Sequence, residues 1–348
     1  MILVTGAAGH IGNVLIRELT ALGNNVRGLV LPGENVQSLE GLNLEIFEGN
    51  ILDKPAMLQA MEDVDTVYHL ASLVSITNDK IDLMRLVNIK GTQNVLDAAK
   101  ESGIKKFIYT SSIHALERPA HGKTIDETLM FDTKNPAGPY DQTKAEASVL
   151  AQKAAAEGMD VTIVCPTGVI GPYDFSRSEM GEMILSWMKK KPSLSLDATF
   201  DFVDIRDVVK GHILAAEKGR KGETYLLSGV DIKISHLRDL VQQAMGIKTM
   251  AVTFPFWFAK AIAPLAEVWY KITRTRPRLT SYSIETLMSN SEISCAKACV
   301  ELGFVARPIE ETVRDTVLWW KNNLNNTHSG LRFDSLLPKK VKSVSDRA

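Results

Sequence analysis

Cysteines, excess charge and long apolar segments are all scarce in this chain, and each scarcity excludes a class of protein. Its 348 residues include three cysteines, too few for the disulfide framework of a small secreted domain. Forty basic residues balance forty-one acidic ones, unlike the basic surface of a nucleic-acid-binding protein. No apolar run reaches the length of a membrane span, and the N-terminus lacks the features of a signal peptide. We therefore expect a cytoplasmic protein with no nucleic-acid partner and no transmembrane segment.

The spacing of the three cysteines does not favour a metal site. Cys165 ends the apolar pattern of residues 161–164 and is expected to be a small buried hydrophobe. Cys295 and Cys299 lie one helical turn apart with no histidine or third cysteine nearby, whereas a zinc site ordinarily takes three or four such ligands. We expect no bound metal.

Three glycines at three-residue spacing follow the first apolar segment. Residues 2–4 suit a buried parallel strand, and apolar residues recur at helical spacing from Ile11 onward. Gly6, Gly9 and Gly12 therefore lie where a strand turns into a helix, and a dinucleotide pyrophosphate can approach the free N–H groups there. Their order differs from G-x-G-x-x-G, so an ordinary strand-to-helix turn is the alternative.

Strand-like and helix-like patterns alternate through most of the chain. The expected strands are residues 2–4, 25–31, 43–47, 66–70, a strand ending at 110, residues 161–165 and residues 224–227. Such alternation predicts an α/β fold with a Rossmann-type doubly wound parallel sheet, built from right-handed βαβ units. Ligand sites are then expected just after each strand, at the carboxyl ends.

The regular alternation weakens after the strand that ends near Pro166. We expect residues 1–172 to form mainly the NAD(P)-binding domain, and residues 173–322 mainly a substrate region interleaved with the last strands. Residues 323–348 read as a polar tail. The aromatic and apolar residues 254–270 predict a buried or lid helix, with membrane-surface contact as the alternative, because charges interrupt the run.

Two motifs suggest chemistry on the expected helices and strand ends. Tyr140 and Lys144 are four residues apart, so both side chains leave one face of a helix, where a nearby ammonium would lower the tyrosine pKa toward working pH. A serine hydroxyl at a strand end, Ser111 or Ser112, can bond a carbonyl oxygen that Tyr140 protonates; a polar strand terminus is the alternative. Asn88, in the apolar helical stripe of residues 85–100, either makes structural bonds or helps to hold the active-site strand.

In this order, the motifs resemble the extended short-chain dehydrogenase/reductase family over residues 1–322. Within it the chain is most similar to the branch of dihydroflavonol reductases and 3β-hydroxysteroid dehydrogenases, and to bacterial NAD-dependent epimerase/dehydratase proteins. The segments that carry the resemblance are residues 5–12, His69-Leu70-Ala71-Ser72, residues 87–92, Thr110-Ser111-Ser112, Tyr140 with Lys144, and residues 166–172.

The resemblance implies a catalytic set of Ser112, Tyr140 and Lys144, with Ser112 a better match than Ser111. It also implies which groups hold the parts of a nicotinamide dinucleotide. The pyrophosphate would lie on Gly6, Ala8, Gly9, His10, Ile11 and Gly12; the adenine on Asn50 and Ile51; the ribose on Leu70 and Ala71; the nicotinamide end on Tyr140, Lys144, Pro166, Thr167 and Val169, with Asn88 and Thr110 completing the set. Asn50 departs from the usual aspartate, although an amide oxygen can still meet the adenine amino group.

These features lead to an expected NAD(P)-dependent oxidoreductase that interconverts a carbonyl and an alcohol on a small, apolar substrate. A sugar-nucleotide epimerase or dehydratase with tightly bound NAD is the alternative. Dehydratases of the family carry an Asp-Glu pair beside the catalytic hydroxyl, whereas Ile113, His114 and Ala115 follow Ser112 here. The run before residues 202–204 is acidic, where sugar-nucleotide enzymes tend to place an arginine. A redox-sensing protein without catalysis would not need Tyr140 and Lys144.

The sequence carries weaker indications about the pocket, the cofactor and the assembly. Side chains expected to line an apolar pocket are Phe131, Phe175, Met180, Met183 and Trp187, which could equally be core. The second strand ends in Val30 and Leu31, neither an acid for NAD nor an arginine for NADP, and Arg27 is expected to point to one face of the sheet. We expect a modest preference for NAD over NADP. The sequence is compatible with a homodimer.

Overall fold

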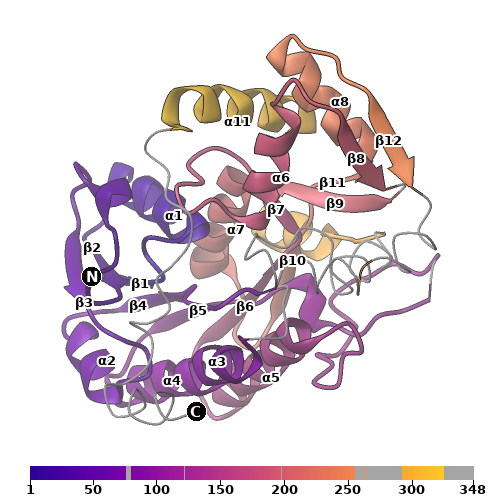
Figure 1. The fold of residues 1–348 in the computed structure, drawn as a ribbon. Helices are drawn as coiled ribbons and strands as arrows, with labels where there is room; N and C mark the ends of the chain where they lie inside the picture. Colours follow the sequence, from indigo (N-terminus) through magenta and orange to yellow (C-terminus); the bar gives the residue numbers. More distant parts are fainter. Residues whose placement is uncertain (76–79, 121, 197, 255–262, 264–291, 325–348) are drawn as a thin grey trace, which may run out of the picture.

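The computed structural model describes residues 1–75, 80–120, 122–196, 198–254, 263 and 292–324, and its centre is a seven-stranded parallel sheet (Figure 1). The strand order is β10-β6-β5-β4-β1-β2-β3. The strands are β1 (Ile2–Thr5), β2 (Val26–Val30), β3 (Glu45–Glu48), β4 (Thr66–His69), β5 (Lys106–Thr110), β6 (Val161–Pro166) and β10 (Thr224–Leu227). The order reverses direction next to β1, which is where a doubly wound sheet binds its ligand. The expected Rossmann-type α/β fold is confirmed.

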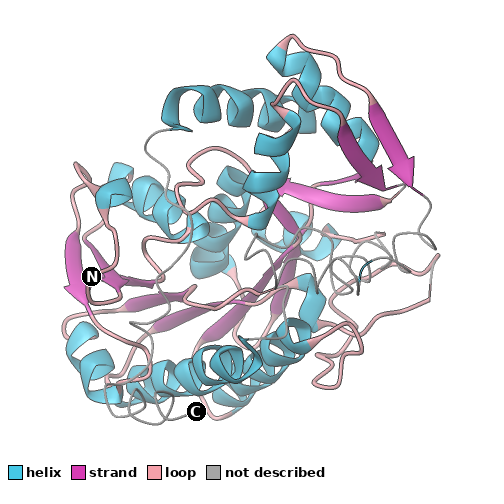
Figure 2. Cartoon of the chain, in the orientation of Figure 1, coloured by secondary structure: helices cyan, strands magenta, loops and turns pink. Residues whose placement is uncertain are grey.

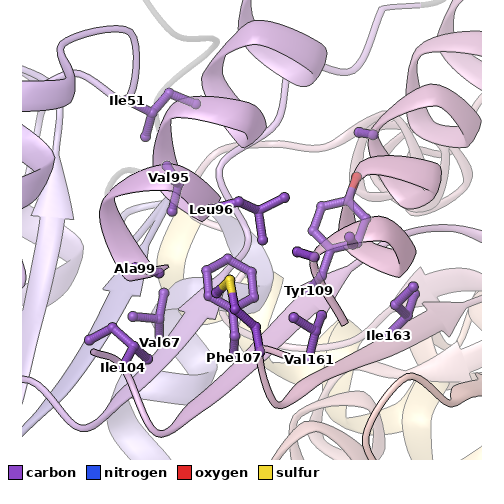
Figure 3. Packing of buried hydrophobic residues seen from close by; sticks show 14 of the residues in the cluster. Ile51, Val67, Val95, Leu96, Ala99, Ile104, Phe107, Tyr109, Val161 and Ile163 are labelled. Carbon is purple, nitrogen blue, oxygen red and sulfur yellow. The ribbon is translucent and has the colours of Figure 1, made fainter. Parts of the chain in front are cut away.

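Successive strand residues point to opposite faces, so each face has its own apolar core. On one face Leu3, Val67 and Phe107 pack against helices from the first half of the chain; Figure 3 shows part of this cluster. These helices are α2 (Lys54–Ala60), α3 (Ile81–Met84), α4 (Thr92–Glu101) and α5 (Pro139–Ala156). On the other face Val4 and Ile108 pack against α1 (His10–Ala21) and α7 (Ile205–Lys218). The inner strands are therefore buried on both sides, whereas the edge strand β3 is mostly exposed.

A second group of elements lies beyond the carboxyl end of the main sheet (Figures 1 and 2). Its three-stranded sheet has the order β11-β9-β7, and a two-stranded sheet pairs β12 with β8. The elements are β7 (Gly168–Ile170), α6 (Glu179–Trp187), β8 (Ser193–Leu196), β9 (Thr199–Asp204), β11 (Val230–Lys233), α8 (Ile234–Met245), β12 (Ala251–Phe254) and α11 (Ile309–Asn323). A third core joins α6, α8, α11 and β9. Because α7 and β10 return to the main sheet, the chain crosses between the two groups more than once.

Several sequence expectations have a definite outcome here. The helical stripe of residues 85–100 is helical throughout, but its first part, η3 (Arg85–Gly91), is a π-helix that continues into α4. Trp187 is buried in the third core, whereas Phe131 is half-buried against the first core. The apolar segment 254–270 and the tail fall almost wholly outside the described residues. Within those residues, no helix combines the length and apolarity needed to cross a membrane.

Candidate functional site

The glycine turn joins β1 to α1 in a conformation that only a residue without a side chain fits easily. Gly6 has φ +72°, and a Cβ there would lie 2.9 Å from the backbone N of Ala71. Gly9 is the N-cap of α1, whose first turn has no side-chain cap and no acidic residue. The positive end of this helix is thus left uncompensated by protein carboxylates, which suits an anionic ligand.

The backbone of Leu70 and Ala71, beside the glycine turn, is held by a buried chain of hydroxyls. Thr5 Oγ1 accepts hydrogen bonds from the N–H groups of both residues at 3.2 Å. Its single proton is then directed to Nδ1 of His69, 2.8 Å away, so Nε2 of the imidazole donates to Thr92 Oγ1 at 2.9 Å. Burial lowers the pKa of His69 to about 3, and the ring is neutral at working pH. This histidine therefore fixes the loop at the end of β4.

Asn88 joins that same loop to the helix that carries the tyrosine. Its Nδ2 donates to Leu73 O at 3.0 Å and to Thr143 Oγ1 at 3.1 Å, while its Oδ1 accepts from Leu73 N at 2.7 Å and Ser72 Oγ at 3.2 Å. Of the two roles considered for this side chain, the bonds describe a clamp between the β4 loop and α5. A direct contact with the cofactor stays a prediction.

The expected adenine site lies after β3. Asn50 Oδ1 accepts a hydrogen bond from Leu52 N at 2.9 Å, which fixes the turn. The carbonyl of Ile51 accepts from Asn94 Nδ2 at 3.1 Å, and Gly91 of η3 packs on the Ile51 side chain. The η3 and α4 segments thus hold this loop from one side.

Ser112, Tyr140 and Lys144 come together where β5 ends and α5 begins. The Ser112 side chain lies close enough to the Tyr140 phenol to lower its pKa. One turn along α5, Lys144 Nζ donates to the carbonyl of Thr110 at 2.6 Å and lies 5.0 Å from the centre of the Tyr109 ring. Gly138 and Pro139 start α5 just before the tyrosine, so the helix aims both side chains at the strand end.

The electrostatics of this group differ from the sequence expectation in one respect. Burial raises the pKa of Tyr140, and the neighbouring Asp141 carboxylate raises it further, whereas Ser112 acts in the opposite direction. The sequence led us to expect that Lys144 lowers the pKa of Tyr140, but burial outweighs any such effect. Burial also lowers the pKa of Lys144 to about 8, because desolvation penalises the ammonium.

The segment after β6 is fixed by contacts with β10, β9 and the glycine turn. Thr167 N donates to Leu227 O at 3.2 Å, which keeps this segment beside β10. Gly168 lets the Phe200 ring approach, since a Cβ would lie 2.6 Å from its Cε1. Farther on, His10 Nε2 meets the carbonyl of Pro172 at 2.9 Å and joins this segment to the glycine turn. The predicted cofactor residues of β1, β4 and β6 thus lie along one edge of the sheet.

Glu34 is a candidate residue that the last residues of the second strand did not reveal. Pro32 and Gly33, which has φ +74°, turn the chain so that Glu34 N donates to Leu31 O at 2.9 Å. The Glu34 carboxylate then accepts from Leu31 N at 2.8 Å, and burial raises its pKa. A Pro-Gly pair followed by an acid was the available signal, because such a turn reverses the chain onto the strand end.

Arg27 lies as the sequence indicated, on one face of the sheet. Its guanidinium forms two bonds to Glu45 at 2.8 and 3.0 Å and two to the carbonyls of Ala60 and Glu62. It is 9% exposed. These partners hold the Arg27 guanidinium away from the loop of Leu31.

Comparisons with known proteins agree with this arrangement. Residues 2–228 match the model of the NAD dependent epimerase/dehydratase family. The chain is 32% identical to "Sterol demethylase protein B" of Methylococcus capsulatus, covering 92% of this chain and 98% of that protein. It is 29% identical to a putative dihydroflavonol 4-reductase of Synechocystis, covering 92% and 94%. The solved structure of gox2253 has 29% identity and a TM-score of 0.83, covering 94% of this chain and 99% of that one.

Proposed function

The chain belongs to the NAD-dependent epimerase/dehydratase family of extended short-chain dehydrogenases/reductases, and we propose that it interconverts a carbonyl and an alcohol on a small apolar substrate. The observation that carries this proposal is that Ser112 and Tyr140 lie together at the end of β5, where Lys144 Nζ donates to the carbonyl of Thr110. Two donors converge there on the place where a carbonyl oxygen can be bound.

Each of the three side chains has a separate task in reduction. Ser112 donates a hydrogen bond to the carbonyl oxygen, and Tyr140 transfers its proton to the same oxygen. The raised pKa of Tyr140 keeps the phenol protonated until that transfer. Lys144 places a cation beside the phenolate that results. A bound nicotinamide would supply the hydride to the carbonyl carbon. Oxidation runs through the same groups in reverse.

Apolar side chains of the second group of elements favour an apolar substrate over a nucleotide sugar. Phe175, Met180 and Met183 are half-buried against the third core, and Phe175 packs edge-on at 5.1 Å against Trp319. Arg206, just after β9, is bound by Asp204 at 2.7 Å and by Asp315 at 2.8 Å. An arginine held by two carboxylates is poorly placed to clamp a diphosphate.

We also propose a preference for NAD over NADP, enforced by Glu34. Its carboxylate lies at the end of β2, where the adenosine ribose of a dinucleotide is expected, and can accept bonds from the ribose hydroxyls. A 2′-phosphate there would meet a like charge with Arg27 bound elsewhere.

A substrate screen that follows nicotinamide absorbance tests the proposed reaction. Apolar ketones and secondary alcohols are compared with UDP- and dTDP-sugars, each with NAD(H) and NADP(H). We expect net change of the nicotinamide with ketones or alcohols only. Redox-neutral conversion of a nucleotide sugar would assign the chain to the epimerase or dehydratase alternative.

A further inference from the structure

His114 stands two residues beyond Ser112, and its main chain is fixed from both sides. Its backbone N donates to Ser112 Oγ at 3.2 Å. Asn135, with 0% exposure, donates from Nδ2 to the carbonyls of His114 and Leu116, both at 3.1 Å. The short helix η4 (Ile113–Ala115) is therefore a rigid continuation of the strand end that carries Ser112.

The His114 imidazole connects Ser112 with the wall of the expected nicotinamide site. Its ring stacks on Phe200 of β9, with the ring centres 6.0 Å apart and the planes at 24°. Phe200 in turn lies against Gly168, within the segment expected to face the nicotinamide. The imidazole thus stands at the edge of the place where the carbonyl substrate must lie.

The imidazole has unused hydrogen-bonding capacity. Within the described residues, the hydrogen bonds of His114 are made by its main chain, with Ser112 and Asn135, and none is made by its ring. The nearby ions, Arg118 and Asp141, are bound to each other at 3.1 Å. Burial lowers the pKa of His114, so the ring is neutral at working pH and offers one N–H donor and one nitrogen acceptor.

We propose that His114 determines specificity by binding a hydroxyl group on the carbon next to the reacting carbonyl. This inference rests on the proposed function and names its substrate class: apolar α-hydroxyketones, or the corresponding diols in the oxidation direction. A hydroxyl both donates and accepts, which matches a neutral imidazole. A carboxylate or phosphate at that place would need a cation, and Arg118 is neutralised by Asp141.

The test compares benzoin with deoxybenzoin, two apolar ketones that differ by one hydroxyl beside the carbonyl. Binding to the NADH-loaded Tyr140→Phe protein is measured by quenching of NADH fluorescence, so that turnover does not interfere. We expect benzoin to bind about tenfold tighter, the value of one satisfied hydrogen bond. In that background we expect His114→Leu to remove the preference for benzoin and His114→Gln to keep part of it. The control His236→Leu, at an exposed histidine, should leave the preference unchanged.

The outcomes separate this inference from the proposed function. Discrimination of the probes that His114→Leu abolishes supports the role of His114, even if the wild-type enzyme reduces neither ketone and the proposed reaction fails. Equal binding of the two probes, binding of neither, or a preference that survives His114→Leu overturns it. In an enzyme that keeps Tyr140, His114→Leu should lower kcat/KM about tenfold for benzoin and change kcat/KM less than about threefold for deoxybenzoin.

Discussion

Tyr140 is the side chain on which the proposed chemistry depends. Replacing it with phenylalanine removes the proton donor and almost no surface, so we expect turnover to fall by roughly 10²–10⁴-fold. Cofactor affinity should stay within about threefold, because the backbone that surrounds the glycine turn is untouched. Single-turnover rates on a substrate from the screen, with NADH titration, measure both quantities.

Tyr109→Phe is the matched control for this substitution. The Tyr109 hydroxyl lies near Ser148 and Thr92 in the core, and Lys144 Nζ lies over the Tyr109 ring. Its loss should lower stability by about 1 kcal/mol and leave most of the rate. A Tyr140→Phe enzyme that keeps more than about a tenth of the wild-type rate would show that another group supplies the proton.

Lys144 is placed for function at a cost in stability. Burial holds its pKa near 8, below the unfolded value, so the charged side chain destabilises the folded protein at pH 7. Lys144→Met removes that charge and the bond to Thr110, and we expect about 1–2 kcal/mol more stability without cofactor, together with loss of activity. Urea unfolding of the two proteins at pH 7 gives the difference.

The pH dependence fixes the sign of this effect. Between about pH 8 and the unfolded lysine pKa near ~10, the unfolded chain holds a proton that the folded wild type has released. Wild-type stability therefore rises with pH across this window, and the advantage of Lys144→Met shrinks. A difference that stays constant from pH 7 to pH 10 would mean that Lys144 is not desolvated.

At the residue scale, the sequence predicted the identity of the groups better than their electrostatics. Tyr140, Lys144 and Ser112 could be paired because helical spacing and strand ends are local properties. Burial, which sets the pKa of Tyr140, depends on chain segments far away in sequence. Glu34 was missed because a turn, not the strand itself, brings its carboxylate to Leu31.

At the scale of elements, η3 shows how a helix can be placed by one polar side chain. The π-helical turn includes Asn88, whose bonds join the β4 loop to α5. Asn88→Leu leaves Leu73 N, Leu73 O and Thr143 Oγ1 without this partner, so we expect a loss of about 2–4 kcal/mol. Because Thr143 adjoins Lys144, kcat should fall as well. Chemical denaturation and steady-state rates measure the two effects.

Asn94→Leu provides the comparison within α4. This side chain donates to one carbonyl, that of Ile51, at 3.1 Å, so a loss of about 1–2 kcal/mol is expected with kcat little changed. If Asn88→Leu proves no more damaging than Asn94→Leu, the clamp between the β4 loop and α5 contributes little.

Which elements were predictable follows from their burial. The strands of the main sheet lie within two residues of the bounds predicted for them, because each has an apolar segment that ends at small or polar residues. β11 was missed because three of its four residues are exposed and it has no apolar run. The pairing of β7 with β9 was also unpredictable, since a three-residue strand is recognised only through its partner.

At the scale of the whole molecule, the predicted cofactor site is assembled from segments that fold far apart in the chain. The glycine turn, the loops after β2, β3 and β4, and the segment after β6 lie along one edge of the sheet, and His10 joins the first of these to Pro172. Their order along the sheet follows from right-handed βαβ crossovers, which explains why residues scattered over the sequence could be assigned to one ligand. That the cofactor-binding domain ends at residue 172 and the substrate region begins at residue 173 stays a proposal.

A ligand that bridges all these segments should stabilise the folded molecule as a whole, and the size of the effect reports cofactor preference without any substrate. At a concentration one hundred times its Kd, a cofactor adds about 2.7 kcal/mol to the unfolding free energy. We expect NADH to raise Tm more than NADPH at equal concentration, with an affinity difference of less than about 2 kcal/mol, because one half-buried carboxylate enforces it. Glu34→Gln should narrow the difference between the Tm shifts given by NADH and NADPH. Leu31→Arg should reverse that difference through a charge-assisted bond to the 2′-phosphate. Glu40→Gln, which changes an exposed acid on the same connection, should leave the difference as it is. A wild-type protein stabilised more by NADPH would mean that a cation other than Arg27 reaches the 2′-phosphate.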